Sequence, residues 1–351
     1  MKKLAVVILN WNGRTLLEQF LPSLCRYTDY EGVDLIVADN GSTDDSIDYI
    51  KAHYPQVQVL AYPDNKGFAG GYNRALRDVN AEIYCLLNSD VEVTQGWIDA
   101  PLAFFATHPM VAAIQPKIKS YKQTQQFEYA GAAGGYIDRY GYPYCRGRLF
   151  DSVEVDSGQY EQPVSVGWAT GAALFIRSKS FWAVGGFDEA FFAHMEEIDL
   201  ALRIQRRGET LFCVPSSVVY HVGGATLESG DALKVKLNFR NNLLMLYKNL
   251  SRNRSRKVLF VRSFLDVLSA LMFFFKGEKR ACKAVFEARG EYKKMRRIYH
   301  PPKDEMNPLI PGRGSVVMEY YLLRRRYFSS LSKKLQAAPR QKQQTNKDAF
   351  Q

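Results

Sequence analysis

The sequence predicts an α/β protein whose mostly parallel sheet carries helices on both faces and is followed by a basic helical appendage. Two observations predict this class. In the first hundred residues, continuous apolar runs alternate with segments of helical periodicity, as is typical of a parallel sheet buried on both faces. Residues 231–351 then hold 28 Lys and Arg against 9 Asp and Glu, whereas residues 1–230 hold 19 against 27. An acidic front part is therefore joined to a strongly basic back part.

Four strands and three helices are expected in strict alternation before residue 90. Continuous apolar runs indicate strands at 4–9, 33–38, 57–61 and 83–87. Apolar residues at helical spacing, a Ser-Thr-Asp-Asp start signal and a glycine-led stretch indicate helices at 16–24, 42–50 and 67–79. Such sheets bind ligands outside the carboxyl ends of the strands, and here all four of those ends are polar.

The middle of the chain is less regular. Residues 121–162 are rich in Gly, Tyr and Gln without periodicity, and we expect loops or a small irregular insertion beside the site. Apolar runs then indicate strands within 164–176 and at 211–219. Helices are expected at 180–184 and 198–207. The α/β pattern therefore continues through the second of these strands.

A long apolar segment, residues 258–275, follows in the basic part. Its polar residues fall on one narrow helical stripe: Arg262, Ser263, Asp266 and Ser269. Two charges within only 18 residues argue against a spanning helix, and we expect a helix that lies in the membrane interface. Basic runs flank it, and each Lys or Arg near an anionic membrane contributes about 1 kcal/mol. We expect residues 252–297 to anchor the chain on an anionic membrane surface.

These patterns divide the chain into three parts. Residues 1–230 form the α/β domain, residues 231–335 are helical, basic and membrane-associating, and residues 336–351 form a polar tail expected to be disordered. Five scattered cysteines without a CxxC pair indicate neither a zinc cluster nor a disulfide framework. The N-terminal apolar stretch ends too early for a signal peptide. We expect a cytoplasmic protein, peripheral on the inner face of the cytoplasmic membrane.

Acids at the strand ends are the first candidate binding groups. Asp39 follows the second strand and could accept hydrogen bonds from a nucleobase. Asp90 follows the fourth strand and could hold a hard divalent cation together with substrate phosphates. Each could equally be a turn residue or a helix cap, and the residues alone leave this open. The glycine-rich segment 65–76 permits close backbone approach, but it is neither a GxGxxG nor a P-loop motif, so neither a dinucleotide fold nor an ATPase is supported.

A second group of candidates comes later in the chain. Glu196, Glu197 and Asp199 cluster where a helix is expected to begin. The helix dipole favours carboxylates there, so capping is one explanation. The other is that one of them is a general base, its pKa raised by its acidic neighbours. His221 ends the last strand, either as a structural residue or beside a carboxylate-bound Mn²⁺ or Mg²⁺.

The chain resembles family 2 glycosyltransferases, with the rhamnosyltransferase-like subgroup closest. Seven segments carry the resemblance in order: VVILNWNG, VADNGSTDDS, NKGFAGGYNRAL, LLNSDVEV, VGWATGAALFIRS, GGFDEAFFAHMEEIDLALR and VVYH. The resemblance covers about residues 3–245. It implies a GT-A fold, a UDP- or dTDP-sugar donor, a divalent Mn²⁺ or Mg²⁺ ion and an inverting displacement.

The resemblance also implies residue roles. Donor-binding residues would be Asn10, Asp39, Asn65, Lys66, Gly67, Asn73 and Asn88. Asp90 matches the family's DxD metal position, where Asn88 replaces the first acid, and His221 matches a late metal ligand. Glu197 would be the catalytic base in place of the usual Asp, with Asp199 as the second candidate. Acceptor-binding residues would be Trp168, Gly171 and Glu196.

The resemblance therefore implies an enzyme that moves a sugar to a saccharide hydroxyl. The acceptor is expected to be lipid-linked, within lipopolysaccharide O-antigen or capsule biosynthesis. The alternative is a non-catalytic sugar-nucleotide-binding or scaffold protein of the same pathway. Nucleic acid is not an expected partner, because the basic residues interleave with an apolar amphipathic helix and form no recognisable nucleic-acid module.

Overall fold

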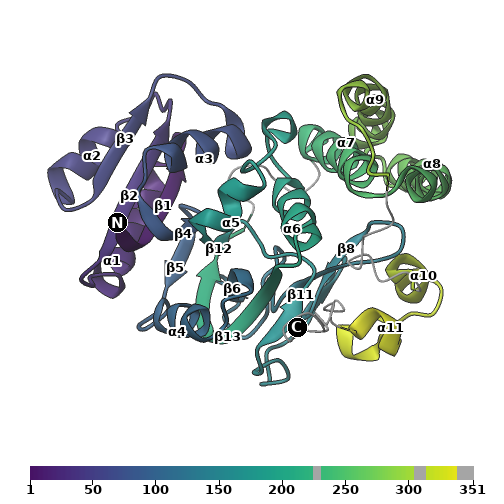
Figure 1. Ribbon diagram of the computed structural model, residues 1–351. Helices are drawn as coiled ribbons and strands as arrows, with labels where there is room; N and C mark the ends of the chain where they lie inside the picture. The colour runs from purple at the N-terminus through teal and green to yellow at the C-terminus, as the bar shows by residue number, and fades with distance from the viewer. Residues whose placement is uncertain (224–230, 304–313, 338–351) are drawn as a thin grey trace, which may run out of the picture.

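The computed structural model describes residues 1–223, 231–303 and 314–337. A nine-stranded sheet lies at its centre, in the order β11-β13-β6-β12-β4-β1-β2-β3, with β5 beside β13 (Figure 1). The strands are β1 (Lys2–Asn10), β2 (Val33–Asn40), β3 (Gln58–Tyr62), β4 (Ala81–Leu87), β5 (Val91–Val93), β6 (Val111–Ser120), β11 (Val164–Val166), β12 (Ala173–Arg177) and β13 (Thr210–His221). All run in one direction except β5, β11 and β12. The mostly parallel sheet is confirmed.

Helices cover both faces of this sheet, as its continuous apolar strands predict. Along β1 the side chains alternate between two cores. Leu4 and Val6 pack in the core that includes α1 (Arg14–Tyr27), α2 (Ser46–His53) and α4 (Asp99–Thr107). Ala5 and Val7 pack in the core that includes α3 (Gly67–Arg77), α5 (Ser178–Ala183) and α6 (Glu196–Arg206).

Residues 121–162, expected to be loops or a small irregular insertion, contain a small second sheet between residues 135 and 153, flanked by loops. The order is β10-β9-β8-β7, built from β7 (Gly135–Ile137), β8 (Pro143–Cys145), β9 (Arg148–Leu149) and β10 (Ser152–Val153). Strands of two or three residues are too short to show a period in the sequence. Buried Tyr136 and Tyr144 stack at 5.7 Å between ring centroids and pack against Phe328, far along the chain.

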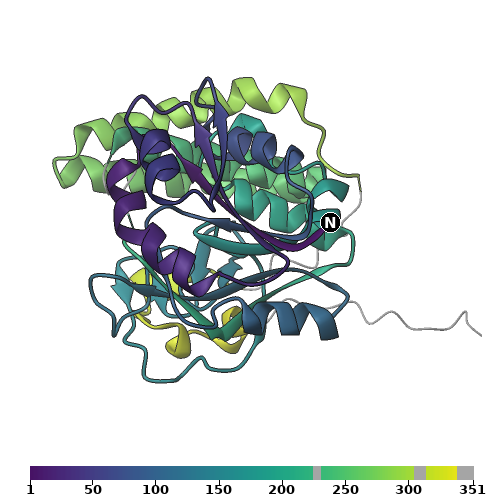
Figure 2. The ribbon, with the colours of Figure 1, turned by 90° about the vertical axis from the view of Figure 1, so that its left-hand side faces the viewer.

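The basic part is helical and packs onto the α/β domain. It comprises α7 (Ala232–Asn249), α8 (Arg252–Phe275), α9 (Lys279–Met295), α10 (Val316–Tyr321) and α11 (Lys333–Gln336). Figure 2 shows the long green helices lying across the top of the molecule. Leu243, Leu246 and Leu335 belong to the same core cluster as the sheet, so the expected boundary at residue 230 does not separate two cores. Gln336, expected in the tail, closes α11, and residues 338–351 lie outside the described residues.

The polar stripe of α8 faces the protein. Buried Arg262 pairs with Asp266 at 3.1 Å, donates to the Asn242 side chain of α7, and lies 4.1 Å from the centre of the Tyr142 ring. Arg289 of α9 lies 2.5 Å from the other Asp266 oxygen. These polar contacts tie α8 to α7, α9 and the second sheet.

Arg262→Met should therefore lower the free energy of unfolding by about 3 kcal/mol, because it removes one partner of a buried ion pair. Thermal denaturation followed by circular dichroism measures this. The matched control is Arg256→Met, an exposed position on the same helix, which should leave the melting temperature unchanged. Equal melting temperatures for the two variants would contradict a stabilising role of the buried Arg262–Asp266 pair.

Candidate active site

Asn10 and Asp39 lie side by side at the carboxyl ends of β1 and β2, where they are register partners. The Asn10 amide nitrogen donates to Asp39 Oδ2 at 2.9 Å, and the Ser42 N–H donates to Asp39 Oδ1 at 2.9 Å. Both side chains are buried, and the Asn10 side-chain oxygen Oδ1 has no hydrogen-bond partner among the described residues. A buried acceptor left unpaired is costly, and a bound ligand that donates to it would remove that cost.

The start of α3 joins these strand ends to the loop before α6. The Asn40 amide donates to Asn65 Oδ1 at 3.0 Å and to the Gly67 carbonyl at 3.1 Å. Gly67 has a φ of +70°, and a Cβ there would come within 2.5 Å of the Phe192 ring, so only glycine fits. The Phe192 carbonyl accepts the Ala69 N–H at 3.1 Å.

Lys66 and Asn73 have protein partners in the structure. Lys66 Nζ lies 2.6 Å from an Asp64 oxygen at the surface. Asn73 is buried, and its amide both donates to and accepts from the Phe187 backbone at 2.9 Å. Because both ends of this amide are occupied, Asn73 positions the turn before the 3₁₀ helix η1 (Glu189–Phe191). Its predicted role in binding the donor stays a prediction.

Asp90 and His221 meet because β5 pairs with β13, where Val91 and His221 are register partners. His221 Nε2 lies 3.0 Å from Asp90 Oδ1 and 3.4 Å from the Asn88 amide nitrogen. On the other side of the ring, Nδ1 lies 3.4 Å from Glu128 Oε2. The sequence analysis named Asn88, Asp90 and His221 as candidate site residues but did not name Glu128.

The electrostatics of this cluster suit a divalent cation. Burial lowers the pKa of His221, but the Asp90 and Glu128 carboxylates outweigh it and raise that pKa to about 10. The adjacent carboxylate oxygen and imidazole nitrogen are donors that Mn²⁺ accepts, and His221 would lose its proton on binding one. Over the described ranges, no group of three or more His, Cys, Asp or Glu side chains is placed to hold a metal ion. Substrate phosphates would therefore have to complete the coordination.

The two glutamates at the start of α6 are the groups best suited to accept a proton. The chain enters this helix through His194 and Met195, both with positive φ (69° and 72°), a strained conformation common at functional sites. Each glutamate keeps one buried oxygen without a hydrogen-bond partner in the part of the chain that the structure describes. Burial raises the pKa of Glu197 to about 7, and burial together with the Glu197 charge raises that of Glu196 well above its ordinary value.

Asp199, the second candidate base, has charged partners on two sides. Its side chain is fully buried, with Oδ2 2.8 Å from Arg203 Nε and 3.0 Å from Lys248 Nζ. Its Oδ1 accepts a hydrogen bond from Asn249 at 2.8 Å. Two cations and an amide hold this carboxylate between α6 and α7, which gives it a structural role, and its role as a second base stays a prediction.

Trp168 is also a structural residue. It is buried, and its indole N–H donates to the Tyr136 carbonyl at 2.9 Å beneath the second sheet. A Cβ on Gly135 would come within 2.1 Å of the indole ring. These contacts give Trp168 a packing role, and its predicted place in the acceptor site stays a prediction. Gly171 lies instead against Phe68 of α3, where a Cβ would come within 2.9 Å of that ring.

Two further residues were missed by sequence reasoning. Glu128 lies in the segment expected to be loops, and no local pattern marks it. Asn241 of α7 donates from one amide nitrogen to the carbonyls of Phe191, Ala193 and His194 at 2.8 to 2.9 Å. It lies in the basic part of the chain, for which only membrane contact was expected.

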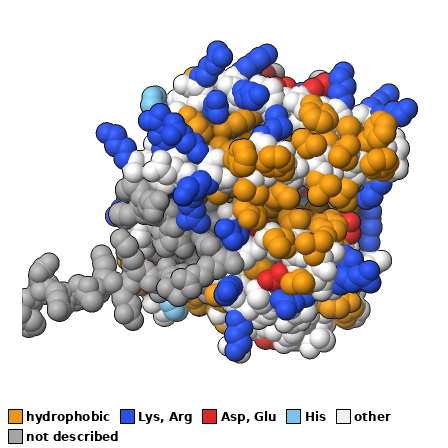
Figure 3. Space-filling view, turned by 90° about the vertical axis from the view of Figure 1, so that its right-hand side faces the viewer, with side chains coloured by type: hydrophobic (Ala, Val, Ile, Leu, Met, Phe, Trp, Pro, Cys, Tyr) orange, Lys and Arg blue, Asp and Glu red, His pale blue; other side chains and the backbone are white. Residues whose placement is uncertain are grey.

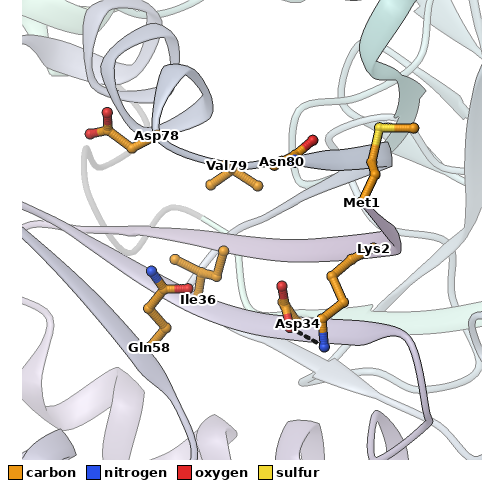
Figure 4. Close-up of a pocket in the computed structure, with 8 residues that line it drawn as sticks. All are labelled: Met1, Lys2, Asp34, Ile36, Gln58, Asp78, Val79 and Asn80. Atoms are coloured by element: carbon orange, nitrogen blue, oxygen red, sulfur yellow. Dashed lines mark ion pairs between the residues drawn. The ribbon is translucent and has the colours of Figure 1, made fainter.

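The molecule also has a hollow of about 480 Å³ at the opposite edge of the sheet. Figure 4 shows its lining, which includes Lys2 and Asp34 joined by an ion pair, together with Asn80. These residues lie at or near the amino ends of β1, β2 and β4. None of the predicted site residues lines it, so it is separate from the candidate active site.

Solved structures with the same architecture identify the fold. Staphylococcus aureus TarS 1–349, solved with UDP-GlcNAc, aligns with a TM-score of 0.54 and 15% identity over 83% of this chain and 80% of that one. The mannosyltransferase PcManGT from Pyrobaculum calidifontis, solved with GDP-Man and Mn²⁺, aligns with a TM-score of 0.51 and 14% identity over 84% of this chain and 75% of that one. The fold is the GT-A fold that the sequence predicts.

Sequence comparison then gives the family. Residues 5–160 match the model described as glycosyl transferase family 2. N-acetylglucosaminyl-diphospho-decaprenol L-rhamnosyltransferase of Mycobacterium tuberculosis is 30% identical over 242 residues, 62% of this chain and 75% of that protein. The O-antigen biosynthesis protein RfbC of Myxococcus xanthus is 24% identical over 222 residues, 62% and 17% of the two chains. The chain belongs to glycosyltransferase family 2, as its motifs predict.

The contacts of the two acids on α6 predict opposite effects on stability. Asp199→Asn should lower the melting temperature, because it leaves Lys248 and Arg203 without their shared buried counter-charge. Glu197→Gln should leave the melting temperature unchanged or raise it, since it removes a half-buried acid without an ionic partner. Differential scanning calorimetry at neutral pH compares the two. A larger fall in melting temperature for Glu197→Gln than for Asp199→Asn would contradict a structural role for Asp199.

Proposed function

We propose that the chain is a metal-dependent, inverting glycosyltransferase that moves a sugar from a UDP- or dTDP-sugar to a hydroxyl of a lipid-linked saccharide. The observation that carries the proposal is the Glu197 carboxylate. It is partly buried, one of its oxygens has no partner, and its pKa is raised to about 7. A general base works best when its pKa lies near the operating pH.

The donor would lie across the carboxyl ends of β1, β2 and β4. Asp39 and Asn10 are proposed to bind the nucleobase, and Asn65 and Gly67 the adjoining part of the donor. Asp90 and His221 would hold Mn²⁺ or Mg²⁺, which supplies positive charge to the leaving diphosphate when bound. The neighbours solved with UDP-GlcNAc and with GDP-Man and Mn²⁺ support this class of donor and cofactor.

The transfer step is assigned to Glu197. Its carboxylate would take the proton of the acceptor hydroxyl while that oxygen attacks the anomeric carbon of the donor sugar. The bond from that carbon to the diphosphate oxygen breaks in the same displacement, so the anomeric centre inverts without a glycosyl-enzyme intermediate. Glu196 and Gly171 are proposed to line the acceptor side.

The named relatives support the kind of acceptor and the pathway. One carries a decaprenol-linked substrate in its name and another O-antigen biosynthesis. We therefore propose a role in surface polysaccharide synthesis, at the inner face of the cytoplasmic membrane, with residues 231–335 in contact with lipid. The second candidate is a non-catalytic sugar-nucleotide-binding protein of the same pathway. It is favoured by one observation, that the described residues contain no group of three or more His, Cys, Asp or Glu side chains placed to hold a metal ion.

Asp90→Ala and Glu197→Gln should each abolish release of nucleoside diphosphate while the protein stays folded, because one loses the cation and the other the base. Release is measured with purified protein, Mn²⁺ and a panel of UDP- and dTDP-sugars. The exposed changes Asp48→Ala and Glu287→Gln are the controls and should retain full activity. Near-normal turnover in both site variants would contradict the residue roles, and donor binding without any release in the wild type would favour the second candidate.

Activity should also depend on pH through Glu197. Its raised pKa means that the base is deprotonated above about pH 7 and becomes protonated as the pH falls. The ratio kcat/KM should then fall about tenfold for each pH unit below that value. A pH–rate profile from pH 5 to 8 measures the effect, as an order-of-magnitude test of the shift. A profile that stays flat down to the ordinary pKa of a glutamate would contradict the assignment.

A further inference from the structure

The apolar face of α8 points away from the protein. Arg262 and Asp266 fix the rotation of this helix by their contacts with α7, α9 and the second sheet. On the other side, a stripe of large apolar side chains is exposed over several turns: Phe260, Phe264, Val267, Leu268, Leu271, Phe274 and Phe275. The exposed fraction is 66% for Phe260 and 82% for Phe275. An exposed apolar patch of this extent marks an interaction surface.

A second exposed apolar segment lies after α10. Leu322 and Leu323 are 71% and 60% exposed, with Met318 and Tyr321 exposed beside them. Arg324, Arg325 and Arg326 follow directly. The segment is held firmly at its base, because Tyr320 and Ser152 share a hydrogen bond of 2.8 Å and the Val316 N–H donates to buried Asp138 at 3.1 Å.

Both segments lie on one side of the molecule. Figure 1 places α8 and α10 along the same edge, and Figure 3 shows apolar side chains gathered on that face with Lys and Arg around them. Lys276, Lys279 and Arg280 are exposed at the end of α8, where they outnumber Glu278. An apolar centre rimmed by cations suits the surface of an anionic bilayer, where the side chains enter the lipid and the cations meet the headgroups.

The same contacts favour a helix lying on the membrane over one crossing it. Among the described residues, α8 is the one helix long and apolar enough to span a bilayer by length and composition. A crossing α8 would have to leave the contacts of Arg262 with Asn242 and of Asp266 with Arg289, and would carry both charges into hydrocarbon.

We infer that α8 and the α10 segment, residues 318–326, form one two-part surface that docks on an anionic phospholipid bilayer. The inference rests on the proposed function, and it extends the expected anchor of residues 252–297 to a segment that sequence reasoning did not include. Arg262, on the protein-facing side of α8, also donates to the Tyr140 carbonyl at 3.2 Å, so this contact would keep α8 attached to the protein when its apolar face docks.

The test is co-sedimentation of the full chain with vesicles of phosphatidylcholine alone or mixed with equal phosphatidylglycerol. Intact protein should bind the mixed vesicles and be released by salt. The double variant Leu322→Ser/Leu323→Ser should weaken that binding about tenfold, as should Phe264→Ser/Leu268→Ser on α8. The matched control is Met110→Ser/Val155→Ser, two exposed apolar positions outside α8 and residues 318–326, which should bind like the intact protein.

Two results would overturn the inference. One is undiminished vesicle binding by the Leu322/Leu323 variant, which would confine docking to α8. The other is a dimer in light scattering that these changes convert to monomer without affecting lipid binding, which would make the face a contact between copies of the chain. Nucleoside diphosphate release without an added acceptor, measured on the same variants, should stay at the wild-type level. If the intact protein binds vesicles as expected but releases no nucleoside diphosphate, the proposed function is contradicted and the docking inference is not.

Discussion

The buried ion cluster around Lys248 is the interaction on which the catalytic side of the molecule depends. Lys248 Nζ lies 2.5 Å from Asp188 and 3.0 Å from Asp199, so one cation of α7 holds both ends of the segment that carries Glu196 and Glu197. Asn241, two turns earlier on α7, holds the three carbonyls just before those glutamates. The strained backbone at His194 and Met195 persists because these contacts leave it no alternative.

This cluster gives the basic part of the chain a second role. The expected appendage is also the element that positions the candidate base, because α7 contacts α6 directly and α8 contacts α7 through Arg262 and Asn242. The proposed lipid-docking surface and the proposed active site are thus joined by two consecutive polar contacts. A lipid-linked acceptor and its enzyme would then share one fixed orientation relative to the membrane.

The sequence predicted the features that depend on local pattern. Apolar runs located the strands, and strand-end acids such as Asp39 and Asp90 fell together because parallel strands end at one edge. It could not show contacts that depend on distant partners. Lys248 of the next helix pairs with Asp199, and the Asn249 amide donates a hydrogen bond to it, so this carboxylate has a structural role that the sequence did not indicate. Trp168 is packed beneath the second sheet, and Glu128 is recognised as a site residue only by its position beside His221.

The proposed donor diphosphate at the strand ends would connect this fold to its chemistry. The most direct measurement is the anomalous X-ray scattering of Mn²⁺ in crystals grown with Mn²⁺ and UDP. The predicted result is a peak bonded to an Asp90 oxygen and to His221 Nε2, with the diphosphate beside it and the base against Asp39. A nucleotide and metal bound in the hollow lined by Lys2 and Asp34, or a metal without contact to Asp90, would contradict the account.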